Sequence, residues 1–158
     1  MEEVFKYVLI AVAASFILFF GYKMIGSISV QGCSTDIAKF EIDLKGMGAN
    51  LRFGARELQT YPIPCRVDRI YLFDMGRGAN PGDFDSMPII KDALISESRS
   101  NVFLIKENDV TSSFYAGDFK LDSPYICLRP KAGRVSFFTE GAGRYSKITL
   151  PGDQPQCS

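Results

Sequence analysis

The sequence predicts an α+β protein in which β-structure dominates, with an N-terminal helix of the transmembrane type followed by a mostly antiparallel β-sheet or sandwich domain with one or two helices. Three observations predict this fold class. Residues 4–25 are apolar almost throughout, whereas the later segments alternate apolar and polar residues with a period of two. About 130 residues follow the apolar segment, which is the usual size of one globular domain.

These patterns divide the chain into three expected parts. Residues 1–26 form the hydrophobic helix, and residues 27–34 are small or polar and form a short stalk. Residues 35–158 form a single β-rich domain outside the cytoplasm. The sequence shows no internal repeat.

The apolar segment has the length and the flanking residues of a membrane span. No charged residue lies between Tyr7 and Tyr22, and Lys6 and Lys23 stand just outside them. A helix over residues 4–25 is about 33 Å long, close to the ~30 Å hydrocarbon core of a bilayer. We therefore expect these two tyrosines and two lysines to lie at the membrane interfaces.

Cleaved or lipid-modified forms of this segment are weaker alternatives. A signal peptide has a basic start and a short apolar region, whereas this chain starts with Glu2 and Glu3 and its apolar run is long. Residues 27–29 offer a small-x-small cleavage site, and residues 30–33 resemble a bacterial lipidation motif with Gln31 in place of a small residue.

The layout of the chain also resembles that of a processed type IV pilin. An acidic N-terminus, a long apolar helix and then a cysteine-bearing, β-rich domain follow one another, and the resemblance covers the first 30 or so residues. It implies that the helix packs against copies of itself in a filament. Ala11 and Ser15 form a small-x-x-x-small pair, a spacing that lets helices approach closely. The sequence leaves the anchor and the filament subunit open.

Four cysteines indicate the compartment. Cys33, Cys65, Cys127 and Cys157 are widely spaced and contain no C-x-x-C pair, so two disulfides are favoured over a zinc or redox site. Disulfides indicate an oxidising compartment, and we expect the domain outside the cell membrane. Of three possible connectivities we favour adjacent pairing, Cys33 with Cys65 and Cys127 with Cys157.

Two helices are expected in the domain. The first begins with Ser34 or Thr35 as its cap and extends at least to Gly46. Its apolar stripe comprises Ile37, Phe40, Leu44, Met47 and Leu51. The second is capped by Ser86 and has Pro88 in its first turn. Its buried face comprises Ile89, Ile90, Ala93 and Leu94.

Strands are expected wherever the period of two is clear, with Gly, Pro and Asp between them. The segments are 55–64, 66–74, 101–106, 112–121, 125–130, 134–140 and 146–150.

Several classes of function are excluded or disfavoured. The chain has no histidine, which excludes Ser-His-Asp and Cys-His catalysis. Its 18 Lys and Arg residues balance 18 Asp and Glu residues, so no net field attracts nucleic acid. The glycines Gly76, Gly78 and Gly82 imitate a dinucleotide-binding turn, but the third is one residue too far and Pro81 intervenes. We expect neither a cofactor nor a nucleic-acid partner.

One loop holds oxygen donors that are candidates for a calcium site. Asp74, Asp83 and Asp85 are the candidate ligands, with Asn80 between them. Their order does not match an EF-hand loop. If these carboxylates cluster in space, an extracytoplasmic hydrolase or a calcium-dependent binding domain is favoured.

The strand segments carry a second resemblance. "IPCRVDRIYLFD", "NVFLIK", "SFYAGDFKL" and "YICLRPKAGRVSFFTEG", behind such a helix, resemble a loosely defined group of small archaeal membrane-anchored proteins of unknown function. The resemblance implies an anchored surface domain and assigns no activity.

The sequence as a whole predicts a non-enzymatic structural or protein-interaction protein at the cell surface. We expect the N-terminal helix to contact membrane lipid or copies of itself, and the domain to meet protein partners outside the cell. A subunit of a pilin-like filament is the alternative.

Overall fold

The computed structural model describes residues 2–47 and 53–157 of the chain, and it describes the side chains of the first helix at residues 3–22 and 33–47. Two compact units divide the chain, residues 1–36 and residues 37–158.

Helix α1 runs from Glu2 to Gly46. The helix expected from Ser34 or Thr35 to Gly46 is present, but as the last part of α1 and not as a separate helix with its own cap. The residues expected to form a stalk, 27–34, also lie within α1. Because this segment contains no proline, its small and polar residues lower helix propensity by only about 1 kcal/mol at a glycine and less at a serine. A helix that is already formed on one side extends at that cost without a new nucleation step.

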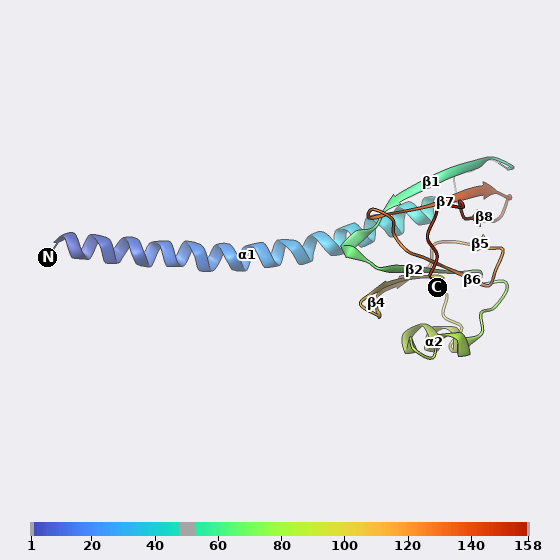
Figure 1. The fold of residues 1–158 in the computed structure, drawn as a ribbon, viewed down its shortest axis with the longest axis horizontal. Coiled ribbons are helices and arrows are strands. Elements are labelled where there is room, and N and C mark those ends of the chain that lie inside the picture. The colour runs from blue at the N-terminus through green and yellow to red at the C-terminus, as the bar shows by residue number, and fades with distance from the viewer. Residues whose placement is uncertain (1, 48–52, 158) are drawn as a thin grey trace. The chain divides into compact units, whose positions relative to one another are not determined.

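The unit of residues 37–158 contains two four-stranded sheets (Figure 1). The first sheet has the order β1 (Arg56–Pro62), β7 (Arg134–Gly141), β8 (Ser146–Thr149), β5 (Phe119–Lys120). The second has the order β4 (Asp109–Phe114), β3 (Val102–Lys106), β2 (Arg69–Phe73), β6 (Tyr125–Leu128). The β5–β8 pair is parallel and the other strand pairs are antiparallel. The predicted β-dominated α+β class is confirmed.

The main core lies between the two sheets and includes the last turns of α1. The predicted stripe is confirmed at Phe40, Leu44 and Met47, which are buried, while Leu51 lies outside the described residues. The ring centroid of Phe40 lies 6.0 Å from that of Tyr61 in β1 and 6.3 Å from that of Phe114 in β4. One side chain of α1 therefore contacts strands of both sheets.

A second core covers the other face of the β2–β3 sheet. Tyr71 and Phe73 of β2 face this second core, while Ile70 and Leu72 face the first. Because successive strand residues point to opposite faces, this alternation means that β2 is buried on both sides. The cover consists of η2 (Pro81–Phe84) and helix α2 (Pro88–Ile95), on the outer side of that sheet in Figure 1.

Three details of the predicted elements need correction. Helix α2 begins after Met87 without a side-chain cap, so Ser86 is not its cap. Ile90 is buried as predicted, but Ile89 is 52% exposed and does not belong to the buried face. The strand expected over 112–121 is interrupted between β4 and β5.

A buried asparagine accounts for that interruption. The Asn101 side chain donates to the carbonyl of Gly117 (2.8 Å) and accepts from the backbone N–H of Ala116 (2.8 Å). Gly117 has φ +93°, a conformation that favours glycine. The backbone between β4 and β5 therefore bonds to this side chain instead of to a neighbouring strand.

Candidate functional site

The described side chains of the first unit include a long apolar surface that is exposed. The stretch Glu3–Tyr22 has a mean hydropathy of 2.2, and none of it is buried. By length and composition it can cross a membrane. Its exposed large apolar side chains are Val4, Phe5, Tyr7, Val8, Leu9, Ile10, Val12, Phe16, Ile17, Leu18, Phe19, Phe20 and Tyr22. A continuous apolar surface of this kind marks contact with lipid or with another protein.

The ends of the stretch carry the residues that the sequence assigned to membrane interfaces. Tyr7 and Tyr22 are both exposed on the helix. The Lys6 ammonium lies 3.7 Å from the Glu3 carboxylate, one helical turn away. The side chain of Lys23 lies outside the described residues. The assignment of these four residues to membrane interfaces stays a prediction.

A shallow groove of about 560 Å³ follows one face of this helix. Ala11 and Ser15 line it, between the larger side chains of Val8, Val12, Phe16 and Phe19. The Ser15 hydroxyl donates to the backbone carbonyl of Ala11 (2.8 Å), so it needs no other partner in an apolar environment. The small-x-x-x-small pair thus lies in the groove.

In the second unit, a disulfide fastens the C-terminal segment to β6. Cys127 and Cys157 are bonded with their Cα atoms 5.4 Å apart, which confirms the predicted pairing of these two cysteines. The Cys157 N–H donates to the Cys127 carbonyl (3.2 Å), and the Arg129 N–H donates to the Pro155 carbonyl (3.0 Å). The C-terminal segment therefore lies along the edge of β6 and covers it.

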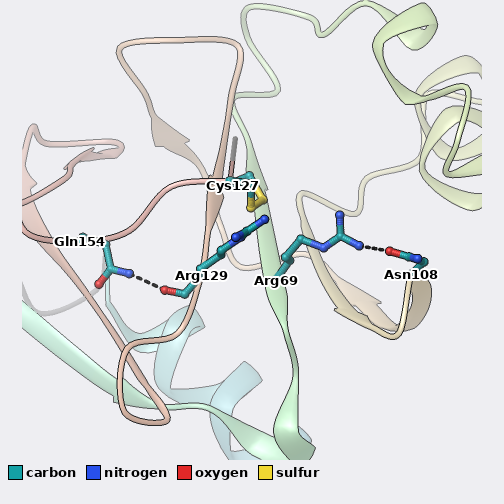
Figure 2. The surroundings of a disulfide bond; sticks show 6 residues. Arg69, Asn108, Cys127, Arg129 and Gln154 are labelled. Carbon is teal, nitrogen blue, oxygen red and sulfur yellow. Dashed lines mark hydrogen bonds between the residues drawn. A yellow bond between two sulfur atoms is a disulfide. The ribbon is translucent and has the colours of Figure 1, made fainter.

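Gln154, in the same segment, joins the two sheets. Its amide nitrogen donates to the Arg129 carbonyl (2.8 Å), as Figure 2 shows, and its amide oxygen accepts from the Ser136 N–H in β7 (2.9 Å). The residue is buried, and both ends of its amide are satisfied.

Cys33 and Cys65 are also disulfide-bonded. The described part of the chain has no free cysteine. All four cysteines are therefore disulfide-bonded, as the sequence predicts, and the pairing of Cys33 with Cys65 stays a prediction.

The structure does not bring the candidate calcium ligands together. Asp74 is buried and accepts from the backbone N–H groups of Gly76 (2.9 Å) and Leu121 (3.1 Å). Asp85 is exposed and pairs with Lys91 (2.7 Å). Within residues 2–47 and 53–157, no group of three or more His, Cys, Asp or Glu side chains could hold a metal ion.

Three tyrosines of the second unit have a pKa above the ordinary value. Burial, with the Asp43 charge, raises the pKa of Tyr61, and burial, with the charges of Asp83 and Tyr71, raises that of Tyr125. The hydrogen bond from Tyr115 to Asp118 raises the pKa of Tyr115. Because their pKa is raised, these three phenols stay protonated at neutral pH. A tyrosine acts as a general base only when it is deprotonated, which requires a lowered pKa.

Two arginines that the sequence did not single out lie close together beside the Cys127–Cys157 disulfide (Figure 2). Arg69 begins β2 and Arg129 follows β6, and both line one open groove. The two residues are 60 positions apart in the chain, so no local sequence pattern indicates that they share a site. They come together because β2 and β6 pair in the sheet.

Comparison of the chain with protein-family models, curated proteins and solved structures finds no significant match.

Proposed function

We propose that the chain is a membrane-anchored protein of the cell surface, in which helix α1 holds a structural or protein-interaction domain outside the membrane. The observation that carries the proposal is the exposed apolar stretch Glu3–Tyr22. Its 20 residues extend about 30 Å as a helix, which equals the thickness of a bilayer core.

The energetics of insertion support a stable anchor. Each Val, Leu, Ile and Phe residue at the centre of a membrane helix favours insertion by about 0.3–0.6 kcal/mol, which over this stretch amounts to several kcal/mol. The Ser15 hydroxyl is satisfied within the helix. The charged side chains of Glu3 and Lys6 lie at one end, where they can reach the interface.

The disulfides support a location outside the cytoplasm. Reducing conditions keep most cytoplasmic thiols free, whereas all the cysteines of the described chain are bonded. A disulfide that ties a terminal segment to a strand edge suits a domain that must persist without chaperones.

The proposal includes no catalytic step. The chain contains no histidine, and the candidate carboxylates Asp74 and Asp85 have separate structural partners. The domain would therefore act through contacts of its surface with a partner.

The anchor is tested by changing the centre of the apolar stretch. An aspartate at the centre of a membrane helix opposes insertion by about 2.5–3.5 kcal/mol, so the pair Val12→Asp and Phe16→Asp should cancel most of the gain. We expect the unchanged chain to resist alkaline carbonate extraction of membranes and to dissolve only in detergent. The double aspartate variant should appear in the carbonate supernatant.

The matched control replaces the same two residues by leucine, Val12→Leu and Phe16→Leu, and should stay in the membrane pellet. Non-reducing electrophoresis of each variant checks that the disulfides of the domain have formed. Release of the unchanged chain by carbonate would contradict the anchor.

A pilin-like filament subunit is the second candidate, and the groove on α1 favours it. Ala11 and Ser15 leave space between larger side chains, where a neighbouring helix could approach. In this case, material sheared from cells should contain helical filaments in electron micrographs. Ala11→Leu with Ser15→Leu should abolish the filaments while leaving membrane retention unchanged. Detergent-dispersed monomers and cells without filaments would reject this candidate.

A further inference from the structure

Arg69 and Arg129 lie next to the last residue pair of two neighbouring strands. In the antiparallel β2–β6 pair Ile70 lies opposite Leu128, Arg69 is the residue before Ile70, and Arg129 is the residue after Leu128. Both side chains belong to the face of the sheet that carries Tyr71 and Cys127, because side chains alternate along a strand. Helix α2 and η2 cover the aromatic part of this face.

Neither guanidinium has a carboxylate partner. Within the described residues, no Asp or Glu oxygen lies within 4.0 Å of Arg69 or Arg129. Arg69 donates through Nη2 to the amide oxygen of Asn108, toward which its side chain turns in Figure 2. Asp68 lies in the same groove, where its Oδ2 accepts from the Glu107 N–H (2.8 Å).

Like charges that lie close together on one face of a sheet repel each other. Asp68 lines the same groove, but its carboxylate lies more than 4.0 Å from both guanidinium groups, so a bound anion would supply the charge partner that these groups lack. The space for an anion exists, because the open groove between them measures about 560 Å³. Its walls are Val67, Asp68, Arg69, Asn108, Arg129 and Pro130.

We propose that Arg69, Arg129 and Asn108 form a binding site for a single oxyanion group, a phosphate, sulfate or carboxylate carried by an extracellular ligand. A guanidinium group presents a planar fork of donors that binds such groups through two parallel hydrogen bonds. Asn108 binds Arg69 through its amide oxygen, and its amide nitrogen is a further hydrogen-bond donor on a residue that lines the groove.

The charges around the groove limit the size of the ligand. Asp68 contributes a negative charge at one wall, and the chain as a whole is electrically neutral. A long polyanion such as nucleic acid would meet this carboxylate and no extended basic surface. The site therefore fits one anionic group and not a strand of them.

The test uses the full chain in a neutral maltoside detergent, titrated separately with sodium phosphate, sulfate, acetate and chloride at constant ionic strength. We expect saturable NMR shifts of the backbone amides of Arg69, Asn108 and Arg129 with an oxyanion and none with chloride. Preference for phosphate or sulfate would identify a tetrahedral ligand, and preference for acetate a carboxylate. Either preference supports the site.

Arg69→Gln and Arg129→Gln should each weaken oxyanion binding about tenfold or more, because each removes a charge-assisted pair of hydrogen bonds. The control is Arg144→Gln, an exposed arginine that lines a different groove. It should bind as the unchanged chain does.

A second readout separates binding from a purely structural role of the arginines. Without anion, Arg129→Gln should melt at the same temperature as the unchanged chain or higher, because it removes a like-charge neighbour. An oxyanion concentration that saturates the unchanged chain should raise its melting temperature clearly more than that of the variant. Equal shifts with chloride, or binding that survives both substitutions, would overturn the proposal.

Discussion

The buried side chain of Asp74 connects backbone segments of both sheets. Its carboxylate is completely buried and bonds to the backbone N–H groups of Gly76 and Leu121. Lys120 (3.3 Å) and Arg77 (3.7 Å) lie beside it and supply positive charge. Because Asp74 follows β2 and Leu121 follows β5, this carboxylate joins the two sheets.

Removal of this carboxylate should destabilise the domain strongly. Asp74→Ala leaves two backbone donors without an acceptor and removes the partner of Lys120, which together should lower the free energy of unfolding by about 3–5 kcal/mol. Denaturant unfolding, followed by circular dichroism in detergent, measures the change.

The control for this substitution is Asp85→Ala. Asp85 pairs with Lys91 at the surface, where an ion pair contributes about 0–1 kcal/mol. If both substitutions had the same small effect, Asp74 would not be the link between the sheets.

At the scale of residues, the sequence predicted the disulfide bonds of the cysteines better than the hydrogen bonds of the buried polar side chains. Cysteine count and spacing indicate disulfides directly. The roles of Asp74, Asn101 and Gln154 depend on backbone groups far away in the chain, and only the folded register brings these together. Asp74 was selected as an oxygen donor for a metal, and its partners are instead N–H groups and cations.

At the scale of elements, the last turns of α1 act as a core element of the domain. Leu44 is 2% exposed and packs in the cluster that both sheets line, whereas Ile42, two residues earlier, is 67% exposed. A short segment of one helix therefore fills the space between the sheets.

Truncation of these two side chains should have very different effects. Leu44→Ala should lower the free energy of unfolding by about 2–5 kcal/mol, because it leaves a cavity in a packed core. Ile42→Ala should change it by less than about 0.5 kcal/mol, as expected of a surface site. Thermal unfolding of both variants, with the unchanged chain beside them, makes the comparison. Equal destabilisation would contradict the packing of this helix face.

Elements in which apolar residues recur with a clear period were predicted well from the sequence. The strands β1, β2, β3, β6, β7 and β8 coincide with alternating segments, and the stripe of Phe40, Leu44 and Met47 is buried. The errors have local causes. Residues 27–34 have a composition typical of a linker but form helix, and the strand expected over 112–121 is interrupted where Asn101 binds its backbone.

At the scale of the whole molecule, the chain combines two kinds of surface. The first unit exposes a stretch of helix that is long and apolar enough to cross a bilayer, and the second is a disulfide-bonded domain with two cores. Lipid suits the first surface and an oxidising aqueous environment suits the second. A protein anchored in the membrane with its domain outside the cell satisfies both requirements.

One measurement tests this account most directly: antibody binding to an epitope added after Ser158, on intact cells and on lysed cells, with membrane retention determined in the same samples. The account predicts equal epitope signals before and after lysis, with the chain in the membrane fraction. With Val12→Asp and Phe16→Asp together, the epitope should be lost from the membrane fraction. A signal that appears only after lysis would place the domain inside the cell and contradict the account.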